Sequence, residues 1–195
     1  MIERLQQLMT LDANMNISDI EERFEQIAMI LFESFAIQKG EKKYLFKEIE
    51  FYFYNKNHRD IITHPRASKS LCWYVNDFGG VDLNFKSNIE CRESKKYDLD
   101  DTSYFGGILI RQLICVNEVG SSKVLSGPLR CAELFKHNDT TSSFNEPQLV
   151  KYDNGMVGYI RKPRINILQP KQIVKEKVSD ILNNYHVYPE KGKLC

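Results

Sequence analysis

The sequence has almost no net charge and no long apolar run, and both absences limit what the protein can be. Lys and Arg number 27 against 26 Asp and Glu, which gives a formal net charge of +1. A field this weak does not draw the whole chain to a polyanion, so a nucleic-acid surface would have to be a local patch. No uncharged stretch reaches the ~18 residues that span a bilayer, and residues 1–5 do not begin an apolar leader. We therefore expect a cytoplasmic protein that has no membrane partner.

The motifs of several site classes are also missing. The five cysteines have no Cys-x-x-Cys spacing and are expected to be reduced thiols; they are Cys72, Cys91, Cys115, Cys131 and Cys195. The chain contains no Gly-rich phosphate loop, no His-x-Glu metal spacing and no Gly-x-Ser-x-Gly elbow. We expect neither a metal nor another cofactor.

Length and periodicity favour one domain over residues 1–195, and we expect a monomer. The 195 residues, 42% of them hydrophobic, suffice for one sizeable core but not for two ordinary domains. Ser18 and Glu21 have capping-box spacing, which predicts that a helix starts at Ser18. Apolar residues then recur at helical steps: Ile17, Ile20, Phe24, Ile27, Leu31 and Phe35.

The remaining elements are mostly strands. Strand-like segments cover residues 34–38, 44–54, 71–75, 81–85, 105–116 and 157–167. Alternation along 44–54 places Phe46, Glu48, Glu50, Tyr52 and Tyr54 on one face and Leu45, Lys47, Ile49, Phe51 and Phe53 on the other. Gly79 and Gly80 favour a hairpin turn between residues 75 and 81. Further helices are expected at 171–185 and after Ser126, which would cap a helix with Pro128 in its first turn. The pattern predicts an α+β fold in which helices flank a curved, mostly antiparallel sheet.

One charged pair stands out against these apolar strands. Arg111 interrupts the apolar segment 105–116 and needs a partner if it is buried, and Glu50 could supply it. A fixed carboxylate can hold and deprotonate a water molecule. The pair can also be a structural salt bridge, and the residues alone favour this reading because ion pairs commonly serve structure without catalysis.

Three separated segments, in order, resemble a known family: Lys47-Glu48-Ile49-Glu50-Phe51-Tyr52, Gly107-Ile108-Leu109-Ile110-Arg111-Gln112-Leu113 and Ser126-Gly127-Pro128-Leu129. With the later Pro163-Arg164-Ile165-Asn166-Ile167, they resemble the alkyladenine (3-methyladenine) DNA glycosylases, over about residues 27–167. In that family a glutamate activates the water that attacks the sugar. An arginine and a backbone carbonyl position that water. The resemblance gives these catalytic roles to Glu50, Arg111 and the carbonyl of Ile165.

The same resemblance implies a site for a base flipped out of double-stranded DNA, because a stacked nucleotide gives water no line of attack. Tyr52 matches the family's stacking tyrosine, and Tyr74 matches a second aromatic that stacks on the base. Either His58 or His64 matches the pocket histidine. Asn84 matches the pocket asparagine. Phe78 would wedge into the duplex. Arg161, Lys162 and Arg164 could form the local basic patch that binds DNA, although a solvated strand end accounts for them equally well.

The sequence thus leads to one principal hypothesis and two rivals. The first is a monofunctional DNA glycosylase of base excision repair, which hydrolyses the N-glycosidic bond of alkylated or deaminated purines. A second is a repurposed member of the fold that binds nucleic acid or a purine ligand without cleaving it. The third is a structural or partner-binding protein in which Glu50 and Arg111 form only a bridge.

Overall fold

The computed structural model describes residues 1–60, 62–76, 78–89, 97–116, 123–136, 146–155, 158–162, 164 and 186–189. The helices in these ranges are α1 (Ile2–Leu8), α2 (Ile17–Ser34) and α3 (Pro128–Ala132), followed by the 3₁₀ turn η1 (Glu133–Phe135). The strands are β1 (Phe35–Lys39), β2 (Lys42–Tyr54), β3 (Trp73–Val75), β4 (Val81–Asn84), β5 (Phe105–Val116), β6 (Lys123–Ser126), β7 (Gln148–Lys151), β8 (Tyr159–Lys162) and β9 (His186–Pro189). Within the described ranges, no helix is long and apolar enough to cross a membrane.

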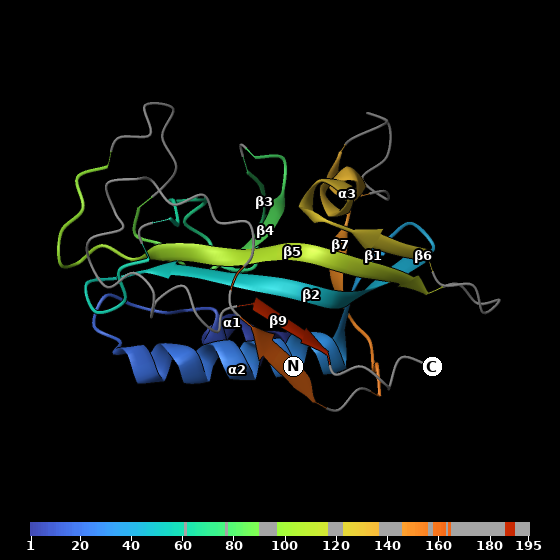
Figure 1. The fold of residues 1–195 in the computed structure, drawn as a ribbon, viewed down its shortest axis with the longest axis horizontal. Coiled ribbons are helices and arrows are strands. Elements are labelled where there is room, and N and C mark those ends of the chain that lie inside the picture. The colour runs from blue at the N-terminus through green and yellow to red at the C-terminus, as the bar shows by residue number, and fades with distance from the viewer. Residues whose placement is uncertain are drawn as a thin grey trace.

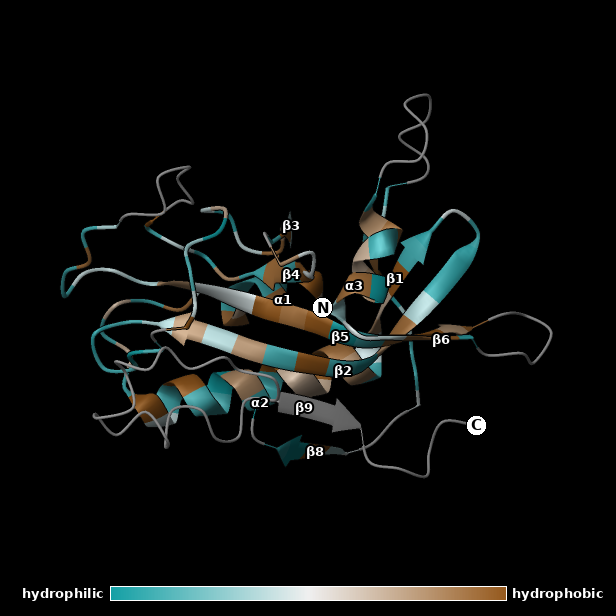
Figure 2. Ribbon diagram, turned by 45° about the horizontal axis from the view of Figure 1, so that its top comes forward, coloured by the Kyte–Doolittle hydropathy of each residue, from teal (hydrophilic) through white to brown (hydrophobic). Residues whose placement is uncertain are grey.

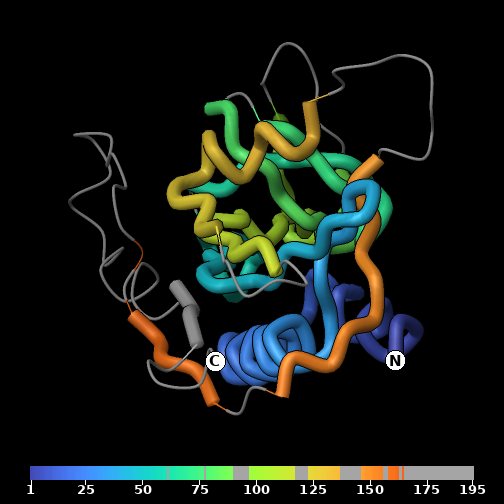
Figure 3. Tube along the Cα trace, turned by 90° about the vertical axis from the view of Figure 1, so that its right-hand side faces the viewer, coloured from blue at the N-terminus to red at the C-terminus, as the bar shows by residue number. Residues whose placement is uncertain are grey.

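The strands form one curled antiparallel sheet built around the long pair β2 and β5 (Figure 1). Its main order is β3-β4-β5-β2-β1-β7, while β6 pairs with β5 and β9 joins β2 to β8. Figure 3 looks along α2 and shows it on one side of the sheet, with α3 on the other. The molecule is therefore an α+β fold, as the sequence predicts.

The main core lies between α2 and the sheet, because α2 carries the apolar stripe that the sequence predicts. Phe24 of α2 stacks on Phe51 of β2 at 4.5 Å between ring centroids and on Phe85 at 5.8 Å. In Figure 2 the middle of β5 is coloured hydrophobic, in agreement with its buried isoleucines Ile108 and Ile110. Buried aromatic side chains of this kind supply much of the packing energy of a core.

A register shift near the middle of β2 and β5 changes which side chains share a face. Pairing steps from Phe46 to Glu48 on β2 and from Ile110 to Gln112 on β5, so Lys47 and Arg111 stand outside the regular ladder. The expected alternation is therefore wrong at Phe46, which joins Ile49, Phe51 and Phe53 in the main core. Leu45 lies instead in a small cluster with Ala36 and Ile114. A bulge adds a residue to a strand and so reverses the alternation beyond it.

Two helix starts also differ from the expectation. The N-cap of α2 is Asn16 rather than Ser18, because the Asn16 side chain accepts from the Asp19 amide at 2.9 Å and donates to the Asp19 carboxylate at 2.9 Å. The N-cap of α3 is Gly127, at φ 93°, with Pro128 in the first turn as predicted. Ser126 ends β6 instead, and its hydroxyl accepts from Gln112 Nε2 at 3.0 Å.

The C-terminal expectations are met only in part. Of the strand pair expected over residues 157–167, the structure describes β8, whose partner is the distant strand β9. The helix expected over 171–185 lies outside the described residues. Helix α1 and strands β6 and β7 lie in segments to which no element was assigned from the sequence.

Candidate functional site

The candidate site is centred on Glu50, whose side chain is fully buried in the middle of β2. Its Oε2 atom accepts a hydrogen bond from the Tyr52 hydroxyl at 2.9 Å and lies 3.1 Å from Arg111 Nη1. Arg111 Nε also lies 3.3 Å from Oε1 of Glu48. The predicted ion pair between Glu50 and Arg111 is confirmed. Arg111 lies outside the regular strand pairing, and its guanidinium forms ion pairs with the carboxylates of both Glu48 and Glu50.

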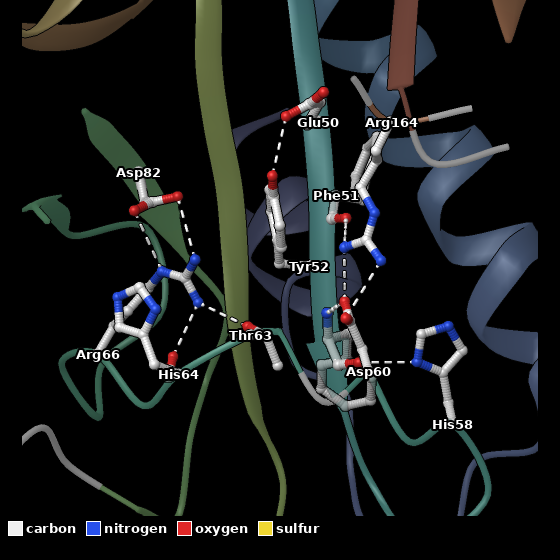
Figure 4. A network of polar contacts seen from close by, with 11 residues as sticks. Glu50, Phe51, Tyr52, His58, Asp60, Thr63, His64, Arg66, Asp82 and Arg164 are labelled. Atoms are coloured by element: carbon white, nitrogen blue, oxygen red, sulfur yellow. Dashed lines mark hydrogen bonds and ion pairs between the residues drawn. The ribbon is translucent and has the colours of Figure 1, made fainter. Parts of the chain in front are cut away.

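Tyr52 lies between two arginines (Figure 4). The guanidinium carbon of Arg164 is 4.6 Å from the centroid of the Tyr52 ring, and that of Arg66 is 5.8 Å from it. Such cation–π contacts strengthen when the groups are desolvated. Burial and the neighbouring Glu50 carboxylate raise the pKa of Tyr52 well above its usual range, although Arg164 opposes them. Tyr52 therefore keeps its proton and donates it to the hydrogen bond with Glu50.

Each of these arginines is bound by a buried aspartate. Arg164 donates to both carboxylate oxygens of Asp60, at 2.7 and 3.2 Å, and also lies 3.3 Å from the carbonyl oxygen of Phe51. Arg66 places Nη2 and Nε each 3.2 Å from the Asp82 carboxylate. Paired guanidinium–carboxylate contacts of this form are geometrically rigid as well as strong.

Sequence reasoning missed both aspartates and misplaced Arg164. Neither aspartate had a signal in the sequence, because Asp82 occupies a polar position in the alternating segment 81–85, which is typical of a solvent-facing side chain, and Asp60 lies in a polar loop. The Arg164 side chain is fully buried against Asp60. It is therefore not part of a basic patch on the surface, and the expectation that it contacts DNA is corrected, because an enclosed guanidinium cannot reach a phosphate.

The two candidate histidines occupy different environments. His58 is fully buried in the core, where Nδ1 donates to the Phe53 carbonyl at 2.7 Å and the ring lies 6.3 Å from that of Phe24. Burial lowers the pKa of His58, with the nearby Asp60 opposing it. His64 instead lies near Tyr74 and Phe78, at ring distances of 6.2 and 6.4 Å. His64 thus lies beside the predicted pocket residue Tyr74 and the predicted wedge Phe78, whereas His58 packs into the core.

Asn84 has an unusual environment for a buried amide. It is fully buried, yet neither Nδ2 nor Oδ1 has a hydrogen-bond partner among the residues that the structure describes. The sheet register places Asn84 opposite Gly107 and Gly107 opposite Tyr52, so the three lie in one row across β4, β5 and β2. Arg66 crosses this row over Gly107, where an added Cβ would lie 3.1 Å from Arg66 Cδ. A buried polar atom without a partner is energetically costly, and the Asn84 amide is therefore a candidate for contact with a bound ligand.

The other predicted residues are more dispersed. Phe78 is 83% exposed in the turn between β3 and β4. Arg161 and Lys162 are exposed on β8, and Arg161 pairs with Glu25 of α2 at 2.8 Å. Ile165 lies outside the described residues. In the described part of the chain, Cys72, Cys115 and Cys131 form no disulfide, and no group of three or more His, Cys, Asp or Glu could hold a metal ion.

Comparison with known proteins found no matching family model, no matching curated protein and no matching solved structure. A fold hosts many activities, so the function has to be argued from the geometry around Glu50.

Proposed function

We propose that this protein is a monofunctional DNA glycosylase, which hydrolyses the N-glycosidic bond of an alkylated or deaminated purine. The observation that carries the proposal is the fully buried carboxylate of Glu50, held at Oε2 by both Arg111 and Tyr52. A carboxylate fixed in this way can orient a water molecule and accept its proton in the transition state. The charge of Arg111 stabilises the carboxylate before the reaction begins.

The reaction assigned to this site needs no covalent intermediate. Glu50 takes a proton from water, the water oxygen bonds to C1′ of the sugar, and the bond from C1′ to the purine nitrogen breaks. The electron pair of that bond leaves with the base. An alkylated purine that carries a positive charge is already a good leaving group, so one carboxylate and a shaped site suffice.

Neighbouring groups are suited to hold the base once it leaves the duplex. The Asn84 amide, which has no hydrogen-bond partner among the described residues, offers an NH₂ donor group and a carbonyl acceptor for the edge of a base. His64 lies between Tyr74 and Phe78 in ring contacts with both, and the exposed ring of Phe78 could fill the gap that the base leaves. Flipped bases are generally held by aromatic faces and polar edges of this kind.

A second function, binding without cleavage, has one specific observation in its favour. The ring of Tyr52, which the glycosylase resemblance assigns to stacking on the base, already has Arg164 and Arg66 against it. A nucleic acid or purine ligand could then bind at Asn84 and His64 while Glu50 and Arg111 serve only as a bridge between β2 and β5.

Single-turnover base release tests the proposal directly. Duplex DNA containing hypoxanthine or 3-methyladenine is mixed with excess protein, either wild type, Glu50→Gln or the surface control Glu133→Gln. We expect Glu50→Gln to release base about 10²–10⁴-fold more slowly and Glu133→Gln to match wild type. Lack of release by the wild type would refute the glycosylase assignment for these lesions, and equal release by Glu50→Gln would remove Glu50 from the mechanism.

DNA affinity measured by fluorescence anisotropy separates binding from cleavage. Each phosphate contact that is lost should flatten the slope of log affinity against log salt by about 0.9. Replacing Arg161 and Lys162 with serine should therefore reduce the slope. Phe78→Ala should instead weaken lesion binding and leave the slope unchanged. Salt-sensitive binding without base release favours the binding function.

A further inference from the structure

Tyr52 has its hydroxyl and its ring engaged at the same time. The hydroxyl donates to Oε2 of Glu50 at 2.9 Å, and Arg111 Nη1 meets the same oxygen at 3.1 Å. Two donors that approach one carboxylate oxygen from different strands restrict the rotation of the Glu50 side chain. The hydroxyl of Tyr52 is thus one of the groups that set where the carboxylate points.

The ring of Tyr52 is held in turn by groups from distant parts of the chain. Arg164 lies 4.6 Å from the ring centroid and is bound to Asp60, 104 residues earlier in the sequence. Arg66 lies 5.8 Å from it and is bound to Asp82 of β4. Figure 4 shows the ring with Arg66 on one side and Arg164 on the other.

The sheet leaves room for this arrangement at Gly107, the cross-strand neighbour of Tyr52. An added Cβ at Gly107 would lie 3.1 Å from both Cδ and Nε of Arg66, closer than ordinary van der Waals contact. The absence of a side chain there allows Arg66 to lie against Tyr52. The orientation of the phenol is therefore determined by two buried ion pairs and a glycine.

We propose that Tyr52 is a positioning residue, whose hydroxyl orients the Glu50 carboxylate for proton abstraction while Arg66 and Arg164 hold its ring, and that it does not serve as the surface on which a base stacks. The inference rests on the proposed function. Tyr52 transfers no proton in this role: it donates one hydrogen bond throughout, and only Glu50 accepts a proton from water. Burial keeps the pKa of Tyr52 above its usual range, in line with a permanent donor.

The test separates the hydroxyl of Tyr52 from its ring. Tyr52→Phe keeps the ring and its contacts with both arginines but removes the bond to Glu50. A hydrogen bond to a charged group is worth about 1.5–3 kcal/mol, so single-turnover base release should slow by roughly tenfold to a hundredfold. The dissociation constant for lesion DNA should not change. Tyr54→Phe on the same strand, whose ring stacks on Phe105, is the matched control and should behave as wild type.

A stacking role predicts the opposite pattern. If the ring carried a base, Tyr52→Phe would release base at the wild-type rate, and Tyr52→Ala would instead weaken lesion binding. Wild-type release by Tyr52→Phe overturns the inference.

A readout that does not need activity keeps the inference distinct from the proposed function. In proton NMR spectra we expect a downfield hydroxyl resonance that is missing in Tyr52→Phe and shifts in Glu50→Gln, because the hydroxyl bonds to a carboxylate. Its absence from the wild-type spectrum overturns the inference. If the resonance behaves as expected but the wild type releases no base, the proposed function fails while the contact between Tyr52 and Glu50 stands.

Discussion

Arg111 Nη1 lies 3.1 Å from Oε2 of Glu50, and this ion pair joins the two central strands next to the point where their register shifts. Glu50 is fully buried and the Arg111 side chain is only 12% exposed. A pair this enclosed contributes less than its Coulomb energy suggests, because both charges lose hydration. Breaking it is costly, however, because one charge is then left buried without its partner.

The first prediction is a double-mutant cycle on this pair. Arg111→Met leaves the Glu50 carboxylate without its cation and should lower the free energy of unfolding by about 3–5 kcal/mol. Arg111→Met combined with Glu50→Gln should be less destabilised, because no uncompensated charge remains. Chemical denaturation of the wild type, the two single variants Arg111→Met and Glu50→Gln, and the double variant measures the coupling energy. Additive losses of stability would contradict an interaction between the two side chains.

The second prediction compares two buried asparagines. Asn84→Leu removes two polar atoms that have no partner among the described residues and cost about 1–3 kcal/mol when desolvated, so the variant should be at least as stable as wild type. Asn55 is the matched control, because its amide donates to the Asp12 and Met15 carbonyls and accepts from the backbone of Asn57 and His58. Asn55→Leu should lose stability in thermal unfolding. An equal loss in both variants would show that Asn84 has partners in the folded protein.

The third prediction concerns two arginines close together in sequence. Arg164 and Asp60 are almost fully buried, whereas Arg161 and Glu25 are 40% and 38% exposed. Arg164→Met should lower the free energy of unfolding by about 3–5 kcal/mol, while Arg161→Met should change it by less than about 1 kcal/mol, as is usual for surface pairs. Similar losses from the two variants in urea titrations would contradict the burial of Arg164.

The fourth prediction is a pH dependence that comes from His58. Because burial lowers the pKa of His58 in the folded protein, the unfolded chain binds the proton more readily. The contribution of neutral His58 to the free energy of unfolding is fully present above the unfolded pKa of about 6.5. It is lost as the pH falls below that value, at up to about 1.4 kcal/mol per pH unit. His58→Gln should reduce the difference between the unfolding free energies at pH 7.5 and pH 5.5. An unchanged difference would exclude His58 as its source.

Long periodic segments were predictable because their signal is local. The apolar stripe of α2, the segment that forms β5 and the glycine turn between β3 and β4 each follow from neighbouring residues. Element ends were less predictable. At α2 the side chain that caps the helix is Asn16, two residues before the expected Ser18, because several polar residues near a helix start can compete for the same backbone amides.

The site was predictable only where a charge stood out against an apolar pattern. Arg111 on a buried strand needs a partner of opposite charge, and the sequence offered Glu50 as that partner. The aspartates that bind Arg66 and Arg164 were not expected from the sequence. Arg164 and Asp60, for example, are 104 residues apart, and no periodicity relates them. The resemblance placed Tyr52 at the site but did not indicate the arginines on its ring.

The sequence by itself thus determined the class of fold, the central strands and the candidate pair of Glu50 and Arg111, because periodicity and isolated charges are properties of neighbouring residues. Only the tertiary structure decided that Phe46 turns into the core, that Arg164 is buried and that Tyr52 is held between Arg66 and Arg164. These outcomes depend on strand register and on contacts between distant segments. Such contacts are set by the packing of the whole chain, and a local pattern does not encode them.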